Sequence, residues 1–170
     1  SVSKMAEIAK SSSGCRGVTL AADVAAAEAL LYARRCSLPA LARLSSLSIL
    51  EDIAVPRKSM AEAVTRIEAI GVKHGLRIGT FGHAGDGNMH PTIVHDHGDT
   101  AAAERAQKAF SEIVEIAQSL GGSASGEHGI GSIKAGFVAN EVSDTVIELQ
   151  RAVKKVFDPN SILNPGKKIP

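Results

Sequence analysis

Apolar residues recur along the chain at the spacing of helix faces in two long segments. Both carry them at i, i+3, i+4 and i+7, which predicts amphipathic helices. The first begins after Ser59 and is closed by Gly75, and the second begins after Asp99 and stops at Gly121. The predicted inner faces are Met60, Ala63, Val64, Ile67 and Ile70 in the first helix, and Ala106, Ala109, Phe110, Ile113, Ala117 and Leu120 in the second.

Three further segments carry helical patterns. Val2 to Lys10 is expected to be the tail of a helix, so that the chain begins inside a fold. Asp23 is a predicted N-cap for a helix that runs to about Cys36 and is interrupted by Pro39. A last helix is predicted from Ser143 to the Asp158-Pro159 pair. Its predicted inward residues are Val146, Leu149, Val153, Val156 and Phe157.

Short apolar runs bounded by turn residues predict strands. They are Gly17 to Ala21, Ser48 to Val55, Ser123 to Ser125, and a hairpin made of Leu76 to Phe81 and Met89 to Val94. The helices and strands do not alternate as they do in a doubly wound sheet. The pattern therefore predicts an α+β fold with helices packed on an antiparallel sheet.

The turn of that hairpin is the first candidate for chemistry. The run from Phe81 to His90 is rich in glycine, aspartate and asparagine, which form tight turns, and it should bring His83 and His90 to one mouth. Neutral imidazole is the commonest metal ligand in proteins, and two imidazoles need one carboxylate to complete a three-ligand site with an open position. Glu127, in a second glycine-rich loop, is the candidate for that carboxylate.

From the residues alone, two interpretations of the histidines stay open. His83, His90 and His128 are flanked by glycines or turn residues, which suits either a metal or catalytic role or a set of hydrogen-bonded structural histidines. A phosphate cradle is disfavoured because neither glycine cluster follows the order of a Rossmann fingerprint or a P-loop. A nucleophilic enzyme is disfavoured because no G-x-S-x-G occurs and neither Cys15 nor Cys36 lies near a histidine in sequence.

Composition narrows the class of protein. The chain has 170 residues, enough for one domain with a proper core, and its formal charge of +1 comes from 19 basic and 18 acidic residues. This balance, with four Phe, one Tyr and no Trp, gives no support for nucleic-acid binding. The two cysteines are expected to be reduced thiols, and no apolar run is long enough for a membrane span, so a soluble protein is expected.

Three motifs together resemble a known family. The motifs, in chain order, are His83-Ala-Gly-Asp-Gly-Asn-Met-His-Pro91, Gly126-Glu-His-Gly-Ile-Gly131 and Leu163-Asn-Pro-Gly-Lys167. They are similar to the signatures of the C-terminal domain of FAD-linked 2-hydroxy-acid oxidoreductases, which include the glycolate oxidase FAD subunit, D-lactate dehydrogenase and D-2-hydroxyglutarate dehydrogenase. The likeness extends from Glu28 to Lys167.

The resemblance implies an architecture and a reaction. Residues 1–170 would be a ferredoxin-like α+β substrate-binding domain that lacks its first strand, and the N-terminal FAD-binding domain of the same parent chain would be absent from this sequence. The reaction would be FAD-dependent oxidation of a D-2-hydroxy acid. Further expected partners are an electron-acceptor protein or a quinone, and a second copy of the chain in a homodimer. The expected location is the cytoplasm, with membrane association through partners, or the mitochondrion in a eukaryote.

The resemblance also implies roles for individual residues. His83, His90 and Glu127 would hold a divalent metal, expected to be zinc, and His128 would act as the catalytic base. Asn164 would contact the FAD cofactor.

Substrate contacts are implied for two further residues. Arg34 would grip the substrate carboxylate, although a solvated helix residue is the alternative. Thr92 stands where many family members have asparagine. Leu50 lies near the position where the hydroxyglutarate enzymes have a lysine for a second carboxylate, and a leucine there favours a short monocarboxylate as substrate. Two rival functions remain for such a site, a metal-dependent hydrolase and a metal-binding module without catalysis of its own.

Overall fold

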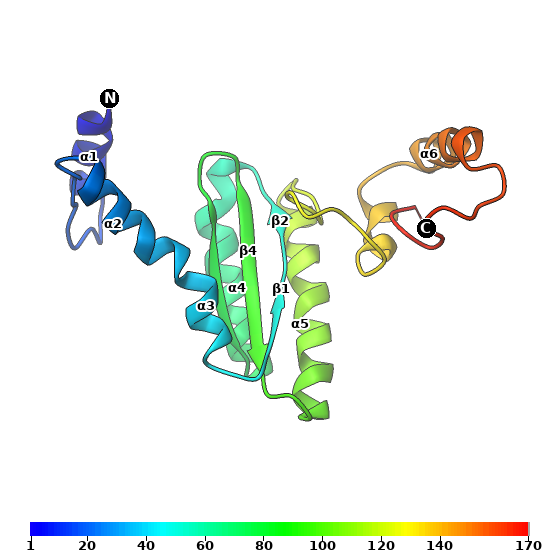
Figure 1. Cartoon of the computed structure of the whole chain (residues 1–170), viewed down its shortest axis with the longest axis horizontal. Helices are drawn as coiled ribbons and strands as arrows, with labels where there is room; N and C mark the ends of the chain where they lie inside the picture. Colours follow the sequence, from blue (N-terminus) through cyan, green and yellow to red (C-terminus); the bar gives the residue numbers. More distant parts are fainter. Residues whose placement is uncertain (170) are drawn as a thin grey trace. The chain divides into compact units, whose positions relative to one another are not determined.

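The computed structural model describes residues 1–169, without the side chains of Leu47 and Leu50. The chain forms two compact units, Ser1–Ala40 and Leu41–Pro170, and each is described by itself. Figure 1 shows the elements in chain order.

The N-terminal unit is helical. It contains α1 (Val2–Ser11) and α2 (Val24–Arg35), and the Asp23 side chain accepts a hydrogen bond from the backbone N–H of Ala26 at 2.8 Å, which confirms the predicted cap. The predicted strand from Gly17 to Ala21 is wrong, because an extended segment becomes a strand only through hydrogen bonds to a partner strand and none is formed here.

Pro39 was predicted to interrupt helical structure, but it lies within a helix. After α2, the chain resumes as the short helix α3 (Ser37–Ala42), with Pro39 in its first turn. Proline is accepted there because the first N–H groups of a helix have no partner within the helix.

A small antiparallel sheet forms the centre of the C-terminal unit. Its strands are β1 (Leu47–Leu50), β2 (Ile53–Ala54), β3 (Arg77–His83) and β4 (Asn88–His95), and each of the other three pairs with β4. The predicted hairpin is confirmed as β3 and β4. The single strand predicted from Ser48 to Val55 is instead two strands, and the one predicted from Ser123 to Ser125 is reduced to one bridge between Ala54 and Ser123.

Two long helices pack on one face of this sheet (Figure 1). They are α4 (Met60–His74) and α5 (Thr100–Ser119). Helix α4 follows the short 3-10 helix η1 (Arg57–Ser59), and α5 follows the β3–β4 hairpin. Their predicted inner faces are confirmed, since each residue of both sets is buried in the core or packed against it. The sheet contributes Ile53, Met89 and Ile93 to the same core.

The last helix differs from its prediction. After the 3-10 helix η2 (Ala135–Asn140), α6 (Asp144–Phe157) forms at the predicted position, but its apolar stripe is exposed. Leu149 is 63% exposed and Phe157 is 79% exposed, and only Ile147 of this helix is buried. The amphipathic pattern is present, but most of the apolar face is exposed.

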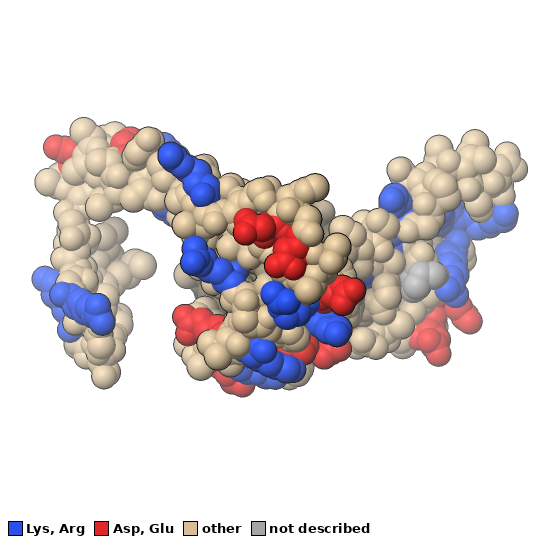
Figure 2. Space-filling view, turned by 90° about the horizontal axis from the view of Figure 1, so that it is seen from below, with Lys and Arg blue, Asp and Glu red and all other residues tan. Residues whose placement is uncertain are grey.

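The part of the chain that the structure describes is thus a mixed α+β protein with six α-helices and a four-stranded antiparallel sheet. None of the helices within residues 1–169 combines the length and the apolar character that crossing a membrane requires. Acidic and basic side chains are intermixed on the face shown in Figure 2, in keeping with the small net charge.

Candidate functional site

The β3–β4 hairpin places two histidines on the same face of the sheet. Phe81 pairs with His90 and His83 pairs with Asn88, and residues directly opposite in an antiparallel pair share a face. Met89, one position away from His90, points to the opposite face and is buried in the helix-covered core. The histidines therefore lie on the face that α4 and α5 do not cover.

The turn between the strands depends on one glycine. Gly87 has a φ of +83°, and its N–H donates to the His83 carbonyl at 3.1 Å. A Cβ at this position would also collide with the carbonyl oxygen of Val55. Both the left-handed backbone and the close approach of Val55, the residue after β2, therefore require glycine here.

Glu127 lies against both histidines. Its Oε1 is 3.5 Å from Nε2 of His83 and 3.2 Å from Nε2 of His90, and one donor atom from each of the three residues lies within 4.8 Å of the others. His90 is buried, whereas the other two are exposed, so the group is open on one side.

This donor set fits a divalent metal. With metal–ligand bonds of about 2.0–2.2 Å, neighbouring donors of a tetrahedral site lie about 3.3–3.6 Å apart, close to the two measured separations. Two imidazoles and one carboxylate also make a ligand set that leaves a fourth position open. Burial and the nearby His128 lower the pKa of His90, and Glu127 opposes this effect. The lowered pKa favours the neutral imidazole, which is the form that metals bind.

His128 adjoins this group without belonging to it. Its ring stacks on that of His90, with centroids 5.1 Å apart and an interplanar angle of 14°. Its Nε2 is 3.8 Å from Oε1 of Glu127, too far for a hydrogen bond, and its side chain is 45% exposed. An accessible imidazole beside an open ligand position has the placement that a general base requires.

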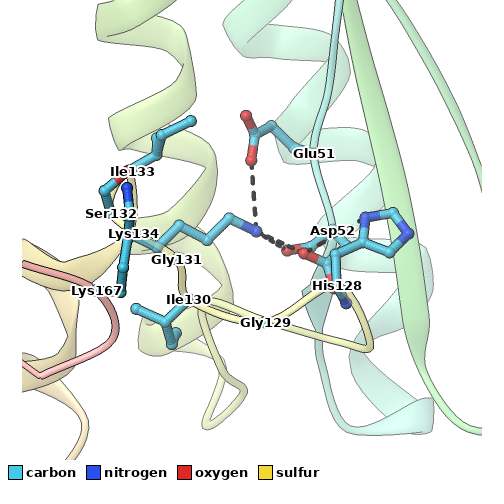
Figure 3. Close-up of a pocket in the computed structure, with 10 residues that line it drawn as sticks. All are labelled: Glu51, Asp52, His128, Gly129, Ile130, Gly131, Ser132, Ile133, Lys134 and Lys167. Carbon is cyan, nitrogen blue, oxygen red and sulfur yellow. Dashed lines mark hydrogen bonds and ion pairs between the residues drawn. The ribbon is translucent and has the colours of Figure 1, made fainter. Parts of the chain in front are cut away.

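A buried charged cluster lies beside the loop that carries His128 (Figure 3). Lys134 Nζ is 2.6 Å from Oδ1 of Asp52 and 3.4 Å from Oε2 of Glu51, and all three side chains are at most 7% exposed. The cluster and His128 line a pocket of about 340 Å³.

The two carboxylates of this cluster respond differently to burial. Burial raises the pKa of Glu51 above its usual range, and Lys134 only partly offsets this effect. Burial also acts to raise the pKa of Asp52, but hydrogen bonds from Lys134 and from the backbone N–H groups of His128 and Glu127 outweigh it and lower the pKa to about 2. Asp52 is therefore the anionic partner of Lys134.

Two buried side-chain atoms at this site have no hydrogen-bond partner among the described residues. They are Oδ1 of Asn88 and Nδ1 of His90. Asn88 also lies so close to Gly126 that a Cβ on Gly126 would collide with its side-chain amide. The loop that carries Glu127 is thus in direct contact with β4.

The remaining predicted site residues lie outside the group formed by the three candidate ligands and His128. Thr92 is fully buried in β4, on the same face as His90, and its hydroxyl is 3.5 Å from the His90 carbonyl oxygen. Asn164 is exposed, has a φ of 45° and lines a pocket of about 660 Å³ with Gly129 and Lys167. Arg34 is exposed in α2 of the N-terminal unit, and the side chain of Leu50 lies outside the described residues. The roles of Arg34, Thr92 and Asn164 stay predictions.

Glu51, Asp52 and Lys134 were not among the predicted site residues. The available signal was the pair of adjacent carboxylates inside an apolar run that was predicted to be one strand, Ser48 to Val55. Charges in such a position need a buried partner or an exposed edge. Nothing local in the sequence indicates that the partner is Lys134.

Comparisons with known proteins agree with the three motifs. A family model described as FAD linked oxidases, C-terminal domain, matches residues 1–168. The glycolate oxidase subunit GlcD of Bacillus subtilis (strain 168) is 48% identical over 139 residues, which cover 82% of this chain and 30% of that protein. GlcD of Escherichia coli (strain K12) is 36% identical over 157 residues, 92% of this chain and 32% of that protein.

A third relative carries a different name. The protein named D-lactate dehydrogenase [cytochrome], mitochondrial, of Arabidopsis thaliana is 32% identical over 123 residues, 72% of this chain and 22% of that protein. The chain thus spans between about a fifth and a third of the length of these relatives.

Proposed function

Because the chain belongs to the family of the C-terminal domains of FAD-linked oxidases, we propose that it binds the substrate and a divalent metal in an FAD-dependent oxidoreductase. The proposed reaction converts a D-2-hydroxy acid of the size of glycolate or D-lactate to the 2-oxo acid. The observation that carries this proposal is the convergence of His83, His90 and Glu127 beside the stacked ring of His128.

In this proposal, residues 1–170 are the substrate-binding domain, with a ferredoxin-like arrangement of strands and helices. FAD is held mainly by an N-terminal domain of the same parent chain, and Asn164 contributes a contact to it. When bound, FAD would supply the acceptor for the hydride that leaves Cα. A base of this chain would take the hydroxyl proton, so that the hydroxy acid loses two electrons and two hydrogens in becoming the 2-oxo acid.

The proposed metal ligands are His83, His90 and Glu127, with zinc as the expected ion. When bound, the metal would supply a Lewis acid next to the substrate's hydroxyl and carboxylate oxygens and so make the hydroxyl proton easier to remove. Burial lowers the pKa of His90 and so favours its neutral form, and its position in the central strand fixes one ligand.

His128 is the proposed base. Its ring is accessible to solvent and lies beside Glu127, and imidazole is the side chain that most often serves as a general base. General-base help of this kind is worth about 10²–10⁴ in rate. Arg34 would clamp the substrate carboxylate by two hydrogen bonds, and Thr92 would contribute a contact from the face of the sheet that carries His90.

A reconstitution experiment tests this function against the two rivals. The chain joined to an FAD-binding domain is assayed with D-lactate or glycolate and an artificial electron acceptor, before and after chelation, and the chain alone is assayed with ester and amide substrates. We expect oxidation that needs both flavin and metal. Hydrolysis by the metal-loaded chain alone would favour the hydrolase, and metal binding with neither activity would leave only a binding module.

A further inference from the structure

A single carboxylate holds the loop that carries Glu127 and His128. Oδ2 of Asp52 accepts hydrogen bonds from the backbone N–H of Glu127 at 2.6 Å and from that of His128 at 2.7 Å. The hydroxyl of Ser125 donates to the same oxygen at 3.3 Å, and the N–H of Gly129 donates to that hydroxyl at 2.8 Å. Successive N–H groups that converge on one anion fix the peptide planes between them.

The same carboxylate is itself immobilised. Lys134 Nζ donates to Oδ1 of Asp52 at 2.6 Å and to its backbone carbonyl at 2.5 Å, and Asp52 is only 1% exposed (Figure 3). Asp52 lies between β1 and β2, which both pair with β4, and the N–H of Glu51 donates to the Pro91 carbonyl in β4 at 3.0 Å. The carboxylate is thus fixed to the strand that contains His90.

These contacts connect the two halves of the proposed metal site. His83 and His90 come from the hairpin, whereas Glu127 comes from a loop distant in sequence. The Asp52 carboxylate contacts the backbone of this loop. Within the described residues, it forms no hydrogen bond with the side chain of His83, His90 or Glu127. Its Oδ1 is 3.9 Å from Nδ1 of His128, so it acts on that residue through the backbone rather than through the ring.

We propose that Asp52, held by Lys134, is a positioning residue that sets the place of Glu127 relative to His83 and His90 and of His128 beside them. This inference rests on the proposed metal site. Groups of this kind, which orient ligands without binding the metal, typically change metal affinity by about 10–100-fold when they are altered.

The chain offers a matched control in Asp158. This residue is 4% exposed, accepts backbone hydrogen bonds from Ile162 at 2.9 Å and Leu163 at 3.0 Å, and pairs with Lys154. It therefore repeats the contacts of Asp52, one buried carboxylate that receives two N–H groups and one ammonium, but at the C-terminal tail. A general cost of removing such a charge should appear in both variants.

The experiment titrates the full chain with Co²⁺ and follows its visible absorption, for wild type, Asp52→Asn and Asp158→Asn. We expect Asp52→Asn to weaken Co²⁺ binding about 10–100-fold and to change the absorption bands of the bound ion, because the ligand geometry is altered. Asp158→Asn should bind within about twofold of wild type, with the same bands, since it touches none of the ligands.

Other results of this titration would overturn either the positioning role of Asp52 or the proposed metal site. Wild-type affinity and bands in Asp52→Asn would overturn the positioning role while leaving the proposed function intact, and so would equal losses in both variants. No Co²⁺ binding by wild type would overturn the proposed metal site itself, and this inference with it.

Where Asp52→Asn does not fold, Ser125→Ala replaces it. This variant removes only the hydroxyl between Asp52 and Gly129, and a lost hydrogen bond of this kind is expected to weaken Co²⁺ binding about fivefold. Unchanged affinity in Ser125→Ala would then overturn the positioning role.

Discussion

The imidazole rings of His90 and His128 stack 5.1 Å apart and nearly parallel, so that a buried ring of the central strand supports an exposed ring of the loop. The stack orients His128 without a hydrogen bond to either of its nitrogens from His90. Its ring thus stays free to exchange a proton beside the proposed ligands.

His128→Asn should therefore separate chemistry from binding. In the protein joined to its flavin domain, we expect turnover to fall by about 10²–10⁴, with bound metal and substrate KM close to wild type. Asparagine keeps a hydrogen-bonding side chain but cannot accept a proton at neutral pH. Steady-state kinetics and elemental analysis of one preparation check this.

A structural role for His128 predicts a different pattern. If the ring only packs on His90, the variant should lose stability and keep its turnover within a few-fold of wild type. The unfolding midpoint, measured on the same preparation, distinguishes the two cases.

His83→Ala should remove one of three metal donors. We expect bound zinc to fall well below one equivalent after purification without chelator, because two remaining donors hold a divalent ion weakly. His97→Ala is the matched control, since His97 is exposed in a loop and its side chain makes no contact with the three donors. Equal zinc in His83→Ala and wild type would rule out this ligand set.

Gly126→Ala should disturb both the fold and the site. A methyl group at this position would collide with the buried amide of Asn88, and such overpacking costs about 1–3 kcal/mol. Because Glu127 is the next residue, metal affinity should fall as well. Denaturant unfolding and Co²⁺ titration measure the two effects.

Gly136→Ala provides the comparison for that variant. Nothing lies within 4 Å of a Cβ built at Gly136, and its φ is not in the left-handed region. We expect no loss in its free energy of unfolding, because alanine in place of glycine at a compatible φ stabilises by about 0.4–1 kcal/mol. A similar loss in both variants would mean that the contact with Asn88 is not the cause.

Lys134→Met should be among the most destabilising single changes in the C-terminal unit. It leaves Asp52 as a buried anion without its ammonium partner, and breaking a buried ion pair in this way costs about 3–5 kcal/mol. Lys73→Met removes a lysine that is 63% exposed in its pair with Glu112, so a cost below about 1 kcal/mol is expected. Urea unfolding of the two variants tests the difference.

Asp158 should make stability depend on acid. The hydrogen bond from Lys154 is the main cause that holds the pKa of Asp158 below its ordinary value of 3.8. A carboxylate with a lowered folded-state pKa stabilises the fold above the unfolded pKa and loses this contribution as pH falls through the folded value. The stability difference between wild type and Asp158→Asn should thus be full at pH 7 and shrink below about pH 4. A difference that stayed constant across this range would contradict the prediction.

Local signals predicted a large part of the fold. Asp23 and Asp99 cap their helices through contacts three residues away, at 2.8 Å in both cases, and such contacts depend only on neighbouring sequence. The β3–β4 hairpin follows from its glycine-rich turn and flanking apolar runs. The turn also brought His83 and His90 into the predicted relationship.

Features that depend on distant parts of the chain were not predicted. The apolar stripe of α6 indicated a buried face, but burial needs a partner surface, and Phe157 is exposed in the described structure. Similarly, the predicted strand is divided into β1 and β2 at Glu51 and Asp52, and Asp52 pairs with Lys134, which lies far along the chain. Periodicity reports which face is apolar and carries no information about what covers it.

The dependence of the Glu127 loop on Asp52 also limits how the site could be transplanted. Grafting residues 125–131 onto another hairpin with two histidines would carry the carboxylate and the imidazole but leave behind the anion that shapes their backbone. A protein engineer would have to move the acidic pair and Lys134 as well, together with β1 and β2, the two strands that flank the pair. The smallest portable unit is therefore the four-stranded sheet with a buried ammonium, rather than a loop.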